Sequence, residues 1–155
     1  MKVVQADQDF NFRSSMSRRN LFHKKEFTFA YFNLGEGQLS VGGIVLSNGK
    51  ETKLYYAVAL CSPEDKFVKE TGRVKIEQHL ILTKYSHKRG VLDVSESNIE
   101  TKSAFRVLKY AADYYLWRED TRLPQWAKGY ELTFRNSYKE QKEENNKYYA
   151  SYLVA

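Results

Sequence analysis

The chain has 155 residues, of which 42% are hydrophobic and 15% aromatic, and it carries a formal net charge of +6. This length and composition predict one domain, residues 1–155, with a hydrophobic core of its own, and the single cysteine excludes an internal disulfide. Because no segment resembles a signal peptide or a membrane span, we expect a soluble, cytoplasmic protein without membrane contact.

Residues 1–25 predict an irregular basic segment at the start of the chain. Within it we expect a short strand at 2–5 and a helical turn at 17–24. A β-meander follows over residues 26–60, because alternating apolar and polar side chains are typical of half-buried strands. Its three strands are expected at residues 26–33, 38–46 and 52–60.

Two glycine-containing turns are predicted to connect these strands. The first is Leu34-Gly35-Glu36-Gly37, and the second, Ser47-Asn48-Gly49-Lys50, contains Asn-Gly, a strong signal for a two-residue hairpin. The last strand ends in the apolar run 55–60, which indicates a central place in the sheet. The meander is therefore expected to be antiparallel.

A helix is predicted over residues 62–85, directly after the meander. Ser62 suits the N-cap position, and Pro63 suits the first helical position. Glu64 and Asp65 would place negative charge at the positive end of the helix dipole. These start signals make the helix the most clearly marked one in the chain.

A cationic stripe follows this predicted start. Lys66, Lys69 and Arg73 fall at i, i+3 and i+7, which would place them on one face of the helix. Gly72 interrupts the helix at a cost of about 1 kcal/mol relative to Ala, and we expect it to permit close packing on a strand. The stripe is the leading candidate for a functional surface.

The second half predicts a short fourth strand at 90–94, a helix at 97–118 and a C-terminal helix at 137–153. A capping box, Ser97-Asn98-Ile99-Glu100, marks the start of the first of these helices. Residues 130–134 alternate like a further strand. Together the elements predict an α+β fold, in which an antiparallel meander of three to four strands packs against two helices and a C-terminal helix follows.

The positive charge is concentrated in the first part of the chain. Residues 1–89 hold 15 Lys and Arg against 9 Asp and Glu, whereas residues 90–155 hold 10 of each kind. A one-sided basic field attracts polyanions and raises their rate of encounter. Surface charge that only keeps the protein soluble is the alternative, and the sequence leaves both interpretations open.

Signals for catalysis are weak. The three histidines and one cysteine form no zinc motif, and a Cys61–His79 nucleophile pair would be separated by several helical turns. Asp93, Glu100 and Lys102 resemble a metal-nuclease arrangement, but Glu100 and Lys102 fit the first turn of a helix better. We therefore predict a non-enzymatic protein without a metal or cofactor.

Anion binding has more support than catalysis. Lys66, Lys69 and Arg73 are predicted to contact the partner, which is nucleic acid or the acidic surface of a nucleic-acid-processing host protein. Four further basic residues are expected to support them, namely Lys88, Arg89, Arg106 and Lys109. The order of three strands and a helix is shared with double-stranded-RNA-binding domains, but the acidic helix start and the long continuation differ from them.

Tyrosines in the predicted C-terminal helix suggest an interface. Tyr148, Tyr149 and Tyr152 cluster there, and Tyr is favoured on surfaces that lose water on binding. The interface would serve a homo-oligomer or a partner. A structural oligomer subunit is accordingly one alternative function.

One short pattern resembles a known group of proteins. Cys61-Ser62-Pro63-x-Asp65-x-Phe67-x4-Gly72-Arg73 is similar to a pattern of small, mostly uncharacterised bacteriophage accessory proteins. The resemblance implies a protein of the host-takeover or counter-defence type, which binds and inhibits a component of its bacterial host. A counter-defence protein that sequesters a cyclic nucleotide signal through its arginines is a further alternative.

Overall fold

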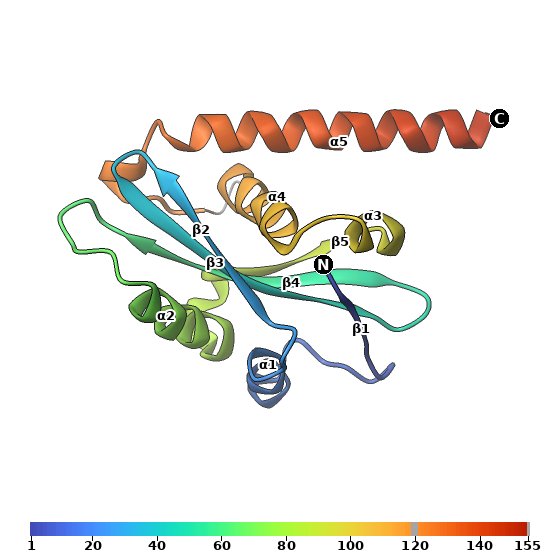
Figure 1. The fold of residues 1–155 in the computed structure, drawn as a ribbon, viewed down its shortest axis with the longest axis horizontal. Coiled ribbons are helices and arrows are strands. Elements are labelled where there is room, and N and C mark those ends of the chain that lie inside the picture. The colour runs from blue at the N-terminus through green and yellow to red at the C-terminus, as the bar shows by residue number, and fades with distance from the viewer. Residues whose placement is uncertain (119–120, 155) are drawn as a thin grey trace.

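The computed structural model describes the backbone of residues 1–118 and 121–154, and the side chains of residues 1–118 and 121–143. In chain order the elements are β1 (Val3–Gln5), α1 (Ser15–Phe22), β2 (Thr28–Leu34), β3 (Gly37–Ser47), β4 (Thr52–Cys61), α2 (Lys69–Ile81), η1 (Thr83–Lys88), β5 (Arg89–Asp93), α3 (Glu96–Glu100), α4 (Ala104–Trp117), η2 (Gln125–Ala127) and α5 (Glu131–Val154), where η marks a 3-10 helix. The fold is α+β, as predicted, with helices on both faces of one sheet (Figure 1).

The sheet has five strands and is mixed, whereas the sequence predicted three or four antiparallel strands. The antiparallel meander β2–β3–β4 forms as predicted, and β5 pairs antiparallel with the outer edge of β4. The added strand is β1, which runs parallel to residues 45–47 of β3. Because β3 has eleven residues and β2 only seven, β2 leaves the end of β3 unpaired, and β1 pairs there.

The two hairpin turns differ in length. Leu34 pairs with Gly37 across a two-residue turn at the predicted position, in which Gly35 has a φ of 62°. Ser47 instead pairs with Thr52, so the second connection has four residues and the two-residue prediction is wrong. The Asn48 side chain accepts hydrogen bonds from two backbone N–H groups within this loop, which stabilises the longer turn.

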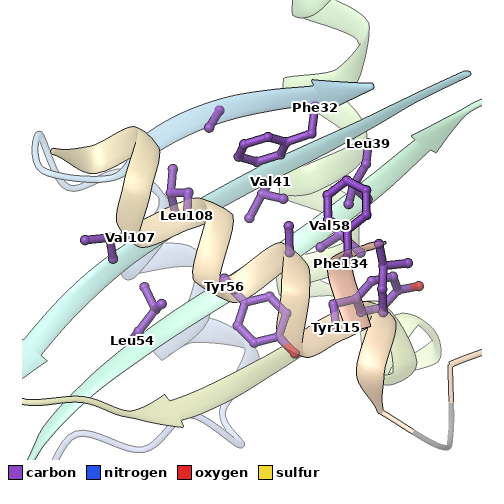
Figure 2. Packing of buried hydrophobic residues seen from close by; sticks show 14 of the residues in the cluster. Phe32, Leu39, Val41, Leu54, Tyr56, Val58, Val107, Leu108, Tyr115 and Phe134 are labelled. Atoms are coloured by element: carbon purple, nitrogen blue, oxygen red, sulfur yellow. The ribbon is translucent and has the colours of Figure 1, made fainter. Parts of the chain in front are cut away.

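A hydrophobic core lies on each face of the sheet. One core packs β2, β3 and β4 against α4 and includes Phe32, Val41 and Leu108 (Figure 2). The other packs the opposite face against α1 and α2, around Ile44 and Leu80. Because β3 and β4 are covered on both faces, most of their residues are buried, as expected of central strands.

The predicted helix over residues 62–85 is wrong at both ends. α2 begins only at Lys69, because Ser62 caps a local turn: its hydroxyl accepts from the Glu64 N–H, and its carbonyl accepts from the Asp65 N–H. At the other end α2 stops at Ile81, and the 3-10 helix η1 follows. The cationic stripe therefore does not lie on one helix, since Lys66 precedes α2.

The predicted helix over residues 97–118 is two helices. α3 ends at Glu100, and α4 starts after Ser103, whose hydroxyl accepts a hydrogen bond from the Arg106 N–H. The strand predicted at 130–134 is also wrong, because α5 already begins at Glu131. The alternation there reflects a helix whose Phe134 and Tyr138, one turn apart, are buried.

Candidate anion-binding surface

Two cations on the first turns of α2 lie over aromatic rings of β2. Lys69 Nζ is 5.2 Å from the centre of the Tyr31 ring, and the Arg73 guanidinium carbon is 4.9 Å from the centre of the Phe29 ring. Arg73 Nε also donates a hydrogen bond of 2.9 Å to the Tyr31 hydroxyl. The Phe67 ring packs edge-on against Tyr31, with 5.6 Å between ring centres. We call these five residues the cation–aromatic surface.

The close approach of α2 to the sheet places these cations beside β2. Gly72 and Ile76 are buried on the sheet side of the helix, and a Cβ on Gly72 would lie 2.9 Å from Ser40 Oγ on β3. Lys69 and Arg73 are four residues apart and therefore share the side of α2 that borders β2. The predicted role of Gly72 in close helix–strand packing is confirmed.

Lys69 and Arg73 are exposed, and their charges are not neutralised by neighbouring carboxylates in the described part of the chain. The ion pairs found among residues 1–118 and 121–143 all use other basic residues. Lys69 is also the first residue of α2, where the positive end of the helix dipole disfavours a cation. The fold therefore gains little from this charge at this position.

Lys66 lies in the loop before α2, at a small cavity. Lys75, Ser40 and Thr71 also line this cavity, which has a volume of about 170 Å³. Ligand pockets for drug-sized molecules have volumes of about 300–1,000 Å³, so a nucleotide does not fit here. Lys66 is exposed and is next in the sequence to Phe67, which belongs to the cation–aromatic surface.

Lys88 and Arg89 lie elsewhere, at the C-terminal end of α2. Arg89 is 9% exposed, and its guanidinium donates to the carbonyls of His79 (3.0 Å) and Leu82 (2.7 Å). Burial, and secondarily the charge of Arg18, lowers the pKa of Arg89 to about 10. Lys88 Nζ donates to the Tyr115 hydroxyl at 3.3 Å, and burial lowers its pKa as well. Both side chains therefore make intramolecular hydrogen bonds and are not free surface charges.

Two arginines that sequence reasoning did not single out complete this internal group. Arg18 of α1 is 2% exposed and donates to the carbonyls of Phe12 and Ile81, at 2.7 and 2.8 Å. Arg118 donates to the Tyr56 hydroxyl and to the carbonyls of His87 and Arg89. We call Arg18, Lys88, Arg89 and Arg118 the internal cations. Arg18, Lys88 and Arg118 each bond to a residue 27 or more positions away in the sequence, a distance that no local pattern spans.

The remaining predicted basic residues lie on α4. Arg106 is exposed, whereas Lys109 pairs with Asp113, which is 0% exposed, and lies over the Phe134 ring at 4.5 Å. Burial raises the pKa of Asp113, and its hydrogen bonds from Lys109 and Ser137 oppose this rise. Lys109 therefore joins α4 to α5 and is not a free surface charge.

The residues considered for catalysis do not gather into a site. His79 Nδ1 is 2.6 Å from the Val58 carbonyl, and the Cys61 thiol faces the carbonyls of the following turn. Asp93 forms an exposed ion pair with Lys53. Among the described residues, no group of three or more His, Cys, Asp and Glu could hold a metal ion.

The structure contains a second hollow, which the sequence did not predict. It lies between the end of α4 and the start of α5, has a volume of about 460 Å³, and is lined by Trp117, Arg118, Thr121, Arg135 and Lys139. The predicted interface tyrosines Tyr148, Tyr149 and Tyr152 belong to the last part of α5, and their side chains lie outside the described residues.

Comparison with known proteins gives no match: no family model matches the chain, and no curated protein or solved structure matches it either. In the described part of the chain, every helix is too short or too polar to cross a membrane.

Proposed function

We propose that this chain is a non-enzymatic binding protein that engages an acidic protein partner through Lys69 and Arg73. The observation that carries the proposal is the pair of exposed cations held over Tyr31 and Phe29. Contact with the rings limits the freedom of these long side chains, so less conformational entropy is lost when they bind an anion. In function, the protein would be an inhibitor of the phage-accessory type.

The arrangement favours a protein partner over nucleic acid. Single-stranded nucleic acid is held by bases stacked on free aromatic faces, whereas here the cations cover faces of the Tyr31 and Phe29 rings. The sequence neighbours of the two cations, Val68 and Val74, are apolar and are 43% and 50% exposed. Mixed apolar and charged patches of this kind are typical of protein interfaces.

The test is fluorescence anisotropy with a labelled poly-glutamate peptide and with labelled single- and double-stranded DNA and RNA, over a salt series. The double variant Lys69→Glu/Arg73→Glu should lower affinity for poly-glutamate at least about tenfold, because two attractive charges become repulsive. The matched control is Lys24→Glu/Lys25→Glu, which changes the net charge equally at two other exposed positions.

The control separates the two partner classes. Non-specific attraction of nucleic acid should weaken equally in both double variants, since it follows net charge. Nucleic-acid binding that depends on Lys69 and Arg73 alone would assign the surface to nucleic acid instead. Poly-glutamate binding that survives the Lys69/Arg73 reversal, or is absent at low salt, would contradict the proposal.

Sequestration of a cyclic nucleotide is a second candidate, favoured by the hollow between α4 and α5. Its volume of about 460 Å³ suits a nucleotide. Arg135 and Lys139 offer positive charges there, and the lining also includes the Trp117 ring, over which Lys142 lies at 5.0 Å. A tight ligand should raise the melting temperature by mass action, and Arg135→Ala should reduce this rise. No shift with any cyclic nucleotide would remove this candidate.

A further inference from the structure

The outer edge of β2 is open. β2 pairs with β3 along all seven of its residues, and no other strand in the described part of the chain pairs with it. Its sequence, TFAYFNL, has no charged residue and no proline, and its register with β3 has no bulge. Natural proteins usually protect edge strands with charged residues, prolines or bulges. An edge strand without them is a candidate for pairing with another chain.

The register shows which backbone groups are available. Leu34 and Gly37 flank a two-residue turn and therefore form a hydrogen-bonded pair. Since hydrogen-bonded and non-hydrogen-bonded pairs alternate in antiparallel strands, the N–H and C=O groups of Phe29, Tyr31 and Asn33 point away from β3. An incoming strand would find three donors and three acceptors along this edge.

The two sides of the edge differ in chemistry. On the α2 side, Lys69 and Arg73 lie over the rings of Tyr31 and Phe29. On the α4 side, Phe105 is 57% exposed, and its ring centre is 5.0 Å from that of Phe32. A strand added to β2 would thus have positive charge beside one of its faces and an aromatic ring beside the other.

We propose that the β2 edge binds an extended partner segment in which acidic and apolar residues alternate. Side chains of a strand point to opposite faces in turn, so acidic residues would meet Lys69 and Arg73 while apolar residues meet Phe105. Backbone pairing supplies affinity and the alternating side chains supply specificity, as in other cases of strand addition. This inference rests on the proposed function and specifies the form of its partner.

Charge complementarity selects an acidic partner over a second copy of this chain. In an antiparallel β2–β2 pair, the Tyr31 residues of the two copies would lie near each other, and the Lys69 side chains above them would repel. β2 itself carries no acidic residue that could relieve this repulsion. An acidic segment instead neutralises the charges on this side of the edge.

The experiment uses labelled synthetic peptides of about eight residues, a length that matches an ordinary strand. One peptide alternates Glu and Val, and a second has the same composition with all Glu before all Val. A third alternates Glu and Val but carries N-methyl groups on alternate amides, which remove the donors needed for pairing. We expect the alternating peptide to bind at least about tenfold more tightly than the other two.

A matched pair of protein variants tests whether the β2 edge itself makes the contact. Asn33→Pro removes one outward N–H without taking a hydrogen bond from the β2–β3 pairing. Asn33→Ala removes only the side chain, which accepts a hydrogen bond from Gln38. We expect Asn33→Pro to abolish binding of the alternating peptide and Asn33→Ala to leave that binding unchanged. The N-methylated peptide tests the same contact on the unaltered protein.

The outcomes distinguish this inference from the proposed function. Equal binding of the alternating, block and N-methylated peptides would overturn strand addition. If that binding still required Lys69 and Arg73, the proposed function would stand. Absence of binding by every peptide and by poly-glutamate would overturn both. Sedimentation that shows a dimer of the free protein, dissociated by Asn33→Pro, would assign the edge to a second copy and also overturn the inference.

Discussion

Basic side chains lie at both ends of α2, but they act differently at each end. At the start of the helix, Lys69 and Arg73 are exposed and lie over aromatic rings. At the end, Arg18 and Arg89 are buried and donate to backbone carbonyls. A cluster of basic residues in a sequence therefore does not by itself mark a binding surface.

The helix itself explains the difference. The last carbonyls of a helix lack intrahelical partners and carry partial negative charge, so buried guanidinium groups satisfy them. The carbonyls of His79, Ile81 and Leu82 are bound in this way. The start of a helix is positive, and a cation there gains nothing from the dipole. Lys69 therefore contacts the Tyr31 ring but gains no stability from the helix dipole.

The largest expected effect is on the internal cations. Arg18→Met should lower the free energy of unfolding by about 3 kcal/mol, because two buried carbonyls lose charged donors. Urea denaturation followed by circular dichroism measures this loss. The variant Arg19→Met, at an exposed neighbouring position, is the control and should change stability little. A loss below about 1 kcal/mol for Arg18→Met would refute the structural role.

A smaller effect is expected from pH at the same end of α2. Burial chiefly, together with the charges of nearby basic residues, lowers the pKa of His79 below its ordinary value of 6.5, although the hydrogen bond to the Val58 carbonyl opposes this shift. The unfolded chain then takes up the proton at a higher pH than the folded chain, so the free energy of unfolding should fall as pH drops below about 6.5. His79→Gln should show a weaker pH dependence between pH 7 and 5. Identical pH profiles would contradict this assignment.

The smallest effect is expected at the start of α2, and it has the opposite sign. Lys69→Glu should raise the free energy of unfolding by about 0.5 kcal/mol, because a carboxylate suits the positive end of the helix dipole. Thermal or urea unfolding at low salt measures the gain, which should shrink as salt is added. A clear loss of stability would mean that Lys69 serves the fold, as the internal cations do.

Parts of the fold followed from local pattern. The strands β2, β3 and β4 lie within two residues of their expected bounds, because alternation and glycine turns act over short distances. The start of α2 did not follow, although Ser62 and Pro63 are good helix-start residues. There the chain stays non-helical through Val68 while Phe67 packs on Tyr31, a contact between distant parts of the chain.

The candidate site was predictable only in part. Lys69 and Arg73 were identified from their spacing, which survives in α2. Lys88, Arg89 and Lys109 were predicted to support them, but the structure commits these three side chains to internal contacts. The open edge of β2 carried no sequence signal, since an edge strand and a paired strand can have the same composition.

By itself, the sequence determined the α+β class, the meander and the excess of positive charge in the first part of the chain, since these depend on composition and on neighbours in the chain. Only the tertiary structure decided which cations are buried and which are exposed. Arg73 bonds to Tyr31, 42 positions away, and Arg18 bonds to Ile81, 63 positions away. Burial and pairing depend on such long-range contacts, which local periodicity does not encode.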